Sequence, residues 1–289
     1  MKDLTQRVAV VTGAASGIGY ALAERFADEG MRVVLADVED QALARASESL
    51  KARGATTLTV RTDVSQARDV EALAEATLAR FGAVHVLCNN AGVGGDAAPT
   101  WEQPLETWRW VLEVNFWGVV HGVRTFVPIM LRQDTEGHIV NTASMAGHLS
   151  MPLLSPYHAT KFAVVSLTES LHYELALANA KLRTSVLCPG FVRTNIMDSA
   201  RNRPEHLRAA LPTAEASQAL LGAFQSVVAA GIPPSVVAER VLEAIREDRF
   251  YVFPHPEMLM AVRARMETLL AQRNPVFVFP EEMRLQPKG

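Results

Sequence analysis

Cysteine is scarce in this chain of 289 residues, which contains only Cys88 and Cys188. The two lie far apart and match none of the spacings by which cysteines hold a metal ion. Each stands at the end of an apolar run, so we expect buried free thiols, as in proteins of a reducing cytoplasm. The sequence therefore predicts a cytoplasmic protein without a metal site.

Charge of one sign and long apolar runs are also missing. The formal net charge is −3, and no basic block indicates nucleic acid or an anionic membrane as partner. The first six residues lead directly into a strand-like run, which leaves no room for a signal peptide. The most apolar segment, 110–123, is interrupted by Glu113, Asn115 and His121, so we expect no membrane span.

A glycine-rich turn follows the first strand-like run. Residues 7–12 are short, apolar and rich in valine, and an amphipathic run begins at Tyr20. In such a unit Gly13 allows the tight turn, Gly17 lets the backbone approach a pyrophosphate, and Gly19 lets the helix pack on the strand. The first N–H groups of the helix would face the phosphates. We therefore predict a dinucleotide site at Gly13, Ser16, Gly17, Ile18 and Gly19.

Asp37 closes the second strand-like run, 32–36. An acid at this place accepts hydrogen bonds from the adenosine ribose hydroxyls and repels a 2′-phosphate. The sequence therefore favours NAD over NADP.

Helical and strand-like segments then alternate to the end of the chain, with strands expected at 57–61, 84–88, 137–142, 182–188 and 250–253. This alternation implies a parallel sheet with helices on both faces. We predict an α/β fold with a Rossmann-type doubly wound sheet of about seven strands, in a single domain over 1–289. Ligands of such sheets bind beyond the carboxyl ends of the strands.

Polar residues stand at that edge and within one helical tract. Asn89 to Gly92 close the fourth strand, and Ser144 lies just past the fifth, where its hydroxyl can donate to a substrate oxygen. Asn115 interrupts the tract 105–132, which reads as one helix or two. A buried asparagine needs partners, so it either holds a water or bends the helix.

Tyr157 and Lys161 are spaced to leave one face of a helix. A phenol titrates near ~10, and a nearby ammonium lowers its pKa. Reaching about 7 requires roughly 4 kcal/mol, more than one lysine ordinarily supplies. We therefore expect a second positive charge nearby, such as an oxidised nicotinamide.

Together these pieces make the sequence similar to the short-chain dehydrogenase/reductase family, in its core-length subfamily. The matching motifs occur in the family's order: the turn 12–19, Asn89-Asn90-Ala91-Gly92, Asn115, Ser144, Tyr157 with Lys161, and Pro189-Gly190 with Thr194. The likeness is close over 7–194 and looser beyond. Ala143 departs from it, because relatives often carry a hydroxyl residue there.

The resemblance implies the roles of these residues. Tyr157 would be the general acid/base, Lys161 would lower its pKa and hold the nicotinamide ribose, and Ser144 would polarise the substrate oxygen. Asn115 would position a water that links Lys161 to solvent. The cofactor would be bordered by Asp37, Asp63, Val64, Asn90, Ala91, Gly92, Pro189, Gly190, Val192 and Thr194.

A largely apolar set of side chains is expected to face the substrate, namely Gly94, Trp101, Ser144, Met145, His148, Leu153, Leu154, Phe191 and Met197. This set indicates a hydrophobic secondary alcohol or ketone. His148 is either a polar contact or a solvent-exposed loop residue. The segment 195–231 resembles the family's mobile lid.

The tail 273–289 carries an apolar run at 276–279 that would cover either a neighbouring subunit or its own domain. The family usually forms dimers or tetramers, so we expect a homodimer or homotetramer. The main hypothesis is an NAD-dependent alcohol dehydrogenase or carbonyl reductase. The alternative is a non-catalytic NAD(H)-binding sensor or scaffold, which has no need of Ser144, Tyr157 and Lys161. An epimerase or dehydratase of the longer relatives is disfavoured by length and glycine spacing.

Overall fold

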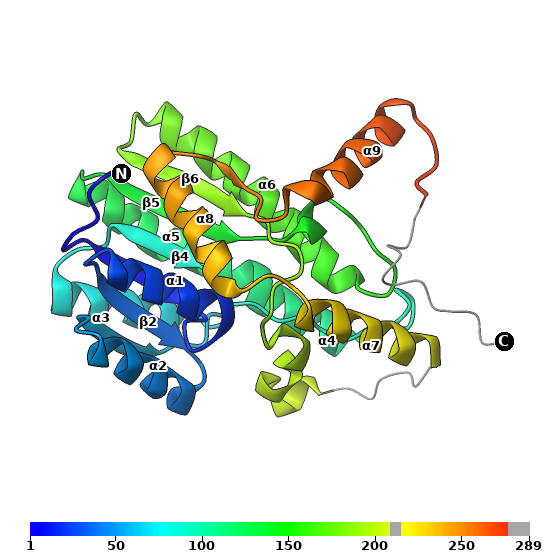
Figure 1. Cartoon of the computed structure of the whole chain (residues 1–289), viewed down its shortest axis with the longest axis horizontal. Helices are drawn as coiled ribbons and strands as arrows, with labels where there is room; N and C mark the ends of the chain where they lie inside the picture. Colours follow the sequence, from blue (N-terminus) through cyan, green and yellow to red (C-terminus); the bar gives the residue numbers. More distant parts are fainter. Residues whose placement is uncertain (209–214, 277–289) are drawn as a thin grey trace.

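A parallel sheet of seven strands forms the centre of the computed structural model (Figure 1), which describes residues 1–208 and 215–276. The strands are β1 (Val8–Thr12), β2 (Arg32–Asp37), β3 (Thr57–Arg61), β4 (Val86–Asn89), β5 (Gly137–Thr142), β6 (Leu182–Leu187) and β7 (Tyr251–Val252). Their spatial order is β3-β2-β1-β4-β5-β6-β7, so the order reverses between β1 and β4. The predicted doubly wound sheet is confirmed, although β7 is shorter than the expected strand 250–253.

Helices cover both faces of this sheet (Figure 1). One face carries α1 (Gly17–Asp28), α2 (Asp40–Ala52) and α8 (Pro234–Glu247), and the other carries α3 (Ala67–Phe81), α5 (Gly118–Gln133) and α6 (Ser155–Leu177). The division follows from strand periodicity, because neighbouring side chains point to opposite faces. Val11 packs against the helices α1, α2 and α8 on one face, and its neighbour Val10 packs against α3, α5 and α6 on the other.

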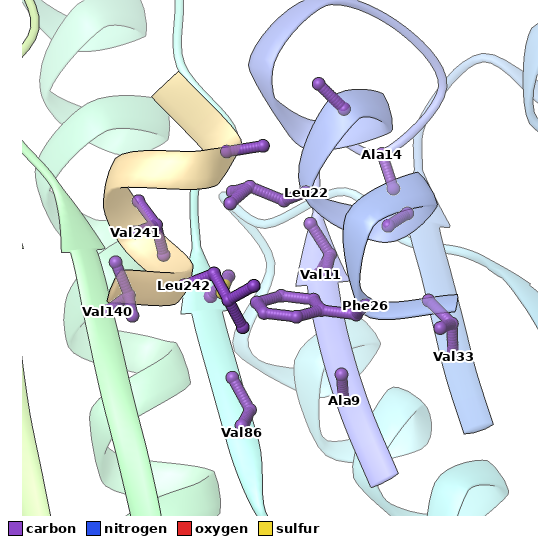
Figure 2. Packing of buried hydrophobic residues seen from close by; sticks show 14 of the residues in the cluster. Ala9, Val11, Ala14, Leu22, Phe26, Val33, Val86, Val140, Val241 and Leu242 are labelled. Carbon is purple, nitrogen blue, oxygen red and sulfur yellow. The ribbon is translucent and has the colours of Figure 1, made fainter. Parts of the chain in front are cut away.

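The core between α1, α8 and the sheet is shown in Figure 2. Phe26 and Leu22 of α1 meet Leu242 of α8 above Val11 and Val86, and all five side chains are almost completely buried. Each such side chain contributes about 1.5–3 kcal/mol by leaving water. This packing holds α1, and with it the turn before α1, against the sheet.

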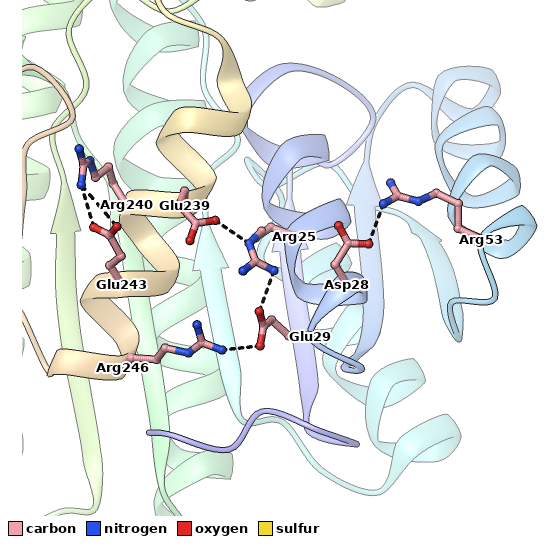
Figure 3. Close-up of polar contacts among 8 residues, drawn as sticks. All are labelled: Arg25, Asp28, Glu29, Arg53, Glu239, Arg240, Glu243 and Arg246. Carbon is pink, nitrogen blue, oxygen red and sulfur yellow. Dashed lines mark hydrogen bonds and ion pairs between the residues drawn. The ribbon is translucent and has the colours of Figure 1, made fainter.

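Ion pairs join the outer surfaces of the same two helices (Figure 3). Arg25 of α1 donates to Glu239 of α8 at 2.7 Å, and Arg246 of α8 pairs with Glu29 at 2.5 Å. These groups are partly exposed, and exposed pairs contribute only about 0–1 kcal/mol each. The apolar core, rather than these charges, fixes the two helices.

The tract 105–133 is continuous and helical. It consists of α4 (Leu105–Leu112), a π-helical turn (Glu113–Trp117) and α5, and Asn115 is the buried residue of that turn. At Asn115 the structure shows a π-helical turn within the helix. By length and composition alone, the tract would be apolar enough to cross a membrane. Its buried side chains Trp110, Phe126 and Met130 instead pack in clusters of this fold.

The remaining elements gather near the carboxyl edge of the sheet. They are short 3-10 turns at Met145–Gly147, Ile196–Asn202, Glu205–Leu207 and Pro256–Met258, with helices α7 (Glu215–Ala229) and α9 (Leu259–Leu270). The lid expected at 195–231 includes residues 209–214, which lie outside the described part, as does the tail from 277 onward. Cys88 and Cys188 are buried free thiols, as predicted.

Candidate active site

A cavity of about 350 Å³ opens at the carboxyl edge of the sheet. Most of the residues predicted to bind a cofactor line it, namely Gly13, Ser16, Gly17, Ile18, Asp37, Asp63, Val64, Asn90, Ala91, Gly92, Tyr157, Lys161, Pro189, Gly190, Val192 and Thr194. Ser144 and the expected substrate contacts Met145, Leu154, Phe191 and Met197 line it as well. The cavity lies where the strand order reverses, which is where doubly wound sheets bind ligands.

Five residues expected at this cavity do not line it. Gly19 and Asn115 stand behind the wall and support it. Trp101 is 85% exposed and does not line the cavity. The His148 ring contacts Cys188 Sγ at 3.4 Å and packs on Phe253, which holds it outside the cavity.

This position corrects the expectation of a substrate contact at His148. Leu153 also lies behind the lining, packed with Phe224.

The glycine turn has the shape that a dinucleotide requires. Gly13 and Gly17 have positive φ angles of 66° and 55°. A Cβ on Gly19 would lie 2.0 Å from the Gly13 carbonyl oxygen, so only glycine fits there. The Thr12 hydroxyl accepts hydrogen bonds from the N–H groups of Asn90 and Ala91 at 2.9 and 3.1 Å. The turn is thus joined to the loop after β4.

Asp37 stands at the cavity wall with each carboxylate oxygen bonded to one main-chain N–H. Oδ2 accepts from Ala15 at 2.9 Å and Oδ1 from Glu39 at 3.1 Å. Burial raises the pKa of Asp37 above its usual range, while these two hydrogen bonds oppose the shift. A carboxylate oxygen accepts more than one hydrogen bond, so Asp37 retains capacity for ribose hydroxyls.

Ser144 follows β5 and begins the turn Met145–Gly147. Its Oγ accepts from the Ala146 N–H at 3.1 Å and donates to the Pro189 carbonyl at 3.3 Å. The second bond is long, and a hydroxyl has a single proton. Donation to a substrate oxygen therefore requires only that the hydroxyl rotate away from Pro189.

Lys161 is buried in the first turns of α6, with 3% of the residue exposed. Its Nζ donates to the Thr142 carbonyl at 2.9 Å, and it lies 5.6 Å from the centre of the Tyr157 ring. Burial lowers the pKa of Lys161 to about 8. One carbonyl satisfies only one of three ammonium donors, which leaves Nζ able to bind hydroxyls in the cavity.

Burial also raises the pKa of the Tyr157 phenol, and hydrogen bonding to Ser144 acts in the opposite direction. In the protein alone the pKa of Tyr157 is thus shifted upward, and the nearby Lys161 does not reverse this direction. A lowered pKa at Tyr157 therefore requires a second positive charge. The burial of Tyr157 makes this requirement stronger, because a low-dielectric site disfavours the phenolate unless cations surround it.

Asn115 fastens the loop after β4 to the π-helical turn. Its Oδ1 accepts from the Val93 N–H at 2.8 Å, and its Nδ2 donates to the Val93 carbonyl at 2.9 Å. A Cβ on Gly92 would lie 3.3 Å from Asn115 Oδ1 and 3.7 Å from Lys161 Nζ. Asn115 and Lys161 thus meet behind the same glycine of the cavity wall.

Two buried histidines that the sequence analysis missed also shape the wall. His255 Nδ1 accepts from the Gly190 N–H at 3.0 Å, and its Nε2 contacts the Phe191 carbonyl at 3.0 Å, so Nε2 carries the proton. His158 Nδ1 donates to the Leu149 carbonyl at 2.7 Å and fixes the loop before α6. No spacing signalled either role; for His255 the only hint was a position between two prolines.

A buried ion pair holds the segment that follows Thr194. Arg203 Nη1 lies 2.5 Å from Asp96 Oδ2, both side chains are under 10% exposed, and Thr107 donates to the same carboxylate at 2.6 Å. The Arg203 guanidinium also stacks 5.2 Å from the Trp110 ring. Removing one partner of a buried pair costs about 3–5 kcal/mol, so the pair fastens this segment to the loop before α4, and Arg203 Nη2 joins it to α4 by donating to the Thr107 hydroxyl at 2.9 Å. Within 1–208 and 215–276 no group of acidic, histidine and cysteine side chains is arranged to hold a metal ion.

Comparison with known proteins decides the family. A model described as short chain dehydrogenase matches residues 7–205. A short-chain dehydrogenase/reductase from Burkholderia phymatum, crystallised in complex with NAD, matches with a TM-score of 0.94 and 48% identity over 97% of this chain and 100% of that chain. The chain belongs to the short-chain dehydrogenase family.

Two curated relatives are similar over nearly their whole length. A CLA biosynthesis dehydrogenase/reductase from Lactiplantibacillus plantarum is 34% identical over 95% of this chain and 97% of its own. A 1-deoxy-11-beta-hydroxypentalenate dehydrogenase from Streptomyces exfoliatus is 38% identical over 91% and 88%. As a short-chain dehydrogenase, the chain is an oxidoreductase that acts on hydroxyl groups with a nicotinamide cofactor.

The cavity fits such a cofactor on its own geometry. The turn at Gly13 and Gly17 leaves room for phosphates at the start of α1, and Asp37 offers acceptors at the far end. Lys161 and Tyr157 lie at the opposite end, beyond Gly92. The glycine turn would hold the pyrophosphate, and Asp37 would hold the adenosine ribose. Lys161 and Tyr157 would hold the nicotinamide ribose.

Proposed function

We propose that this short-chain dehydrogenase transfers a hydride between NAD(H) and a hydrophobic secondary alcohol or ketone, with Tyr157 as general acid/base. The observation that carries the proposal is one cavity lined by the glycine turn, by Asp37 and by Ser144, Tyr157 and Lys161 together. A bound nicotinamide would accept or supply the hydride at carbon. The protein's own task is then to move one proton at the substrate oxygen.

The proton transfer follows from the side chains at the cavity wall. In alcohol oxidation the Tyr157 phenolate takes the hydroxyl proton while the Ser144 hydroxyl donates to the same oxygen and holds it. The buried Lys161 favours the phenolate electrostatically, and a cationic nicotinamide adds to this effect. In ketone reduction Tyr157 gives the proton back. Positioned acid–base groups of this kind contribute about 10²–10⁴-fold to a rate.

The substrate end of the cavity supports an apolar ligand. It is lined by Met145, Leu149, Met151, Leu154, Phe191, Met197, Phe224, Val228 and Met258. Among the described lining residues the cations are Lys161 and Arg201, and Arg201 pairs with Glu39 at the other end, beside Asp37. A carboxylate or phosphate on the substrate would thus meet thioethers and aromatic rings, at a cost in desolvation.

NAD preference is supported by Asp37, whose charge would oppose a 2′-phosphate, and by the NAD complex of the Burkholderia relative. The homo-oligomer and the cytoplasmic location stay predictions. For the former, α9 exposes Met260, Leu269 and Leu270 and buries none of its residues in the chain. Sedimentation of the purified protein would measure the oligomeric state.

A substrate screen tests the proposed function. Reduction of NAD⁺ and of NADP⁺ would be followed by absorbance, with hydrophobic cyclic and aromatic secondary alcohols on one side and sugars and hydroxy acids on the other. We expect turnover with NAD⁺ and apolar alcohols. Turnover confined to charged or sugar-like compounds would contradict the substrate assignment, and no reduction of either dinucleotide by any alcohol would contradict the proposal as a whole.

A further inference from the structure

Two regions far apart in the sequence meet at the Asp37 end of the cavity. Arg201, in the turn Ile196–Asn202, places Nη2 2.6 Å from Oε1 of Glu39, two residues past the end of β2. Asn202 Nδ2 donates to the same oxygen at 2.7 Å. Glu39, Arg201 and Asn202 all line the cavity. The Arg201 guanidinium, from the turn Ile196–Asn202, is therefore paired with the Glu39 carboxylate, which follows β2.

The place of this contact matters for cofactor choice. Glu39 connects the two groups. Its main-chain N–H donates to Asp37 Oδ1 at 3.1 Å, and its side chain binds Arg201, so the Arg201 guanidinium lies near Asp37, the residue expected to bind the adenosine ribose. Among the described lining residues Arg201 is the one cation at this end. Guanidinium groups bind phosphates by two parallel hydrogen bonds. An unpaired arginine here would suit the 2′-phosphate of NADP.

We propose that Glu39 is a second determinant of cofactor preference, because it holds Arg201 and denies a 2′-phosphate its only nearby cation among the described lining residues. Asp37 repels the phosphate, and Glu39 removes the partner that would otherwise attract it. This inference rests on the proposed function, since it assumes that the adenosine ribose lies beside Asp37. It predicts that neutralising Asp37 alone converts the preference incompletely.

The strength of the contact is compatible with that role. The hydrogen bond from Asn202 lowers the pKa of Glu39 most, and the one from Arg201 adds to this effect, so Glu39 is ionised at neutral pH. The side chains of Arg201 and Glu39 are 32% and 30% exposed, so water and salt weaken the pair. Loss of one partner would therefore release the other without unfolding the site. Arg201 Nη1 also donates to the Asp198 carbonyl at 2.8 Å and lies 3.8 Å from the exposed Asp198 carboxylate, which keeps the guanidinium near this position, while Nη2 is the group that Glu39 occupies.

Binding of NADH and NADPH to a set of variants tests the proposal, with the fluorescence of the reduced nicotinamide as readout. The set is wild type, Asp37→Ala, and Asp37→Ala combined with Glu39→Gln, with Arg201→Gln, and with both. Adding Glu39→Gln to Asp37→Ala should improve the NADPH/NADH affinity ratio by about tenfold, the effect of one new charge-assisted pair. In the Asp37→Ala/Glu39→Gln background, adding Arg201→Gln should cancel that gain. In the Asp37→Ala background, where Glu39 is still present, Arg201→Gln should change the ratio less than about threefold.

The matched control is Arg45→Gln, because Arg45 acts electrostatically on Glu39 from α2 but does not line the cavity. In the Asp37→Ala/Glu39→Gln background it should leave the ratio unchanged. An equal effect of Arg201→Gln with and without Glu39, or no gain from Glu39→Gln, would overturn the proposal. If Asp37→Ala fails to fold, Asp37→Asn serves as background. A wild type that binds neither dinucleotide contradicts the proposed function instead.

Discussion

The two walls of the cavity are built differently. The cofactor wall, 12–37, is one continuous strand–turn–helix–strand unit, which Thr12 joins to the loop after β4 and α1 joins to α8. The substrate wall takes its lining from 149–154, 191–197, α7 and Met258, which are separate loops, short turns and one helix joined to distant parts of the chain. Gly190 depends on His255, and Arg203 on Asp96, across 65 and 107 residues.

The two walls have different structural requirements. The cofactor wall needs close backbone approach, which glycines supply at fixed spacing. The substrate wall needs shape, which many residue types supply once buried polar contacts hold the loops. Substitutions in the first should abolish dinucleotide binding, and those in the second should alter substrate use and stability.

The largest effect is expected where the walls meet. Tyr157→Phe should lower turnover by at least about 10²–10⁴-fold, because it removes the proton-transfer group. NADH affinity should stay nearly unchanged, as measured by fluorescence titration. The matched control is Tyr251→Phe, whose hydroxyl donates to Glu169 outside the cavity and whose loss should leave turnover near wild type. A Tyr157→Phe enzyme with near wild-type turnover would remove Tyr157 from the mechanism.

Gly19→Ala should break the cofactor wall. The new Cβ would lie 2.0 Å from the Gly13 carbonyl, so either the turn or α1 must move, and NADH affinity should fall by more than about tenfold. Gly222→Ala in α7 is the control, because nothing lies within 4 Å of its Cβ position. It should raise stability by up to about 1 kcal/mol, since alanine is the better helix former. Unchanged NADH affinity in Gly19→Ala would show that the turn does not bind the dinucleotide.

Lys161→Met should be inactive yet more stable at neutral pH. The pKa of Lys161 falls from 10.5 to about 8 on burial, which corresponds to a cost of about 3 kcal/mol for burying the ammonium. The cost is complete below pH 8 and disappears as the pH rises toward 10.5, where the unfolded chain also loses the proton. In urea unfolding the advantage of the variant should therefore shrink between pH 8 and 10. An advantage independent of pH would contradict the buried cation.

His255→Ala tests the substrate wall and should have the smallest effect. It leaves the Gly190 N–H without its partner, while the Phe191 carbonyl keeps the hydrogen bond from the Ile232 N–H at 3.1 Å, so we expect a loss of about 1–3 kcal/mol in unfolding free energy. KM for the alcohol should rise more than KM for NAD⁺, because Phe191 lines the apolar end of the cavity, where we propose that the substrate binds. His206→Ala, at an exposed histidine, should change neither. A rise confined to the NAD⁺ KM would place His255 with the cofactor wall.

The same contrast explains how much could be predicted from the sequence. The order of strands and helices followed from apolar periodicity, and the cofactor wall followed from Gly13, Gly17, Gly19 and Asp37. The π-helical turn at Asn115 was open to two interpretations, because a single asparagine does not define helix geometry. His148 was misplaced because its contacts, Cys188 and Phe253, come from later strands. No spacing predicted the roles of Arg203 and His255, since each acts through a partner that only the folded chain brings near.

A crystal structure of the protein with NAD⁺ tests the central claim most directly. The account predicts that the nicotinamide ring lies beside Pro189 and Thr194, with its C4 edge facing the hydroxyls of Tyr157 and Ser144 and its ribose on Lys161. A dinucleotide bound with the Tyr157 hydroxyl turned away from that edge would contradict it.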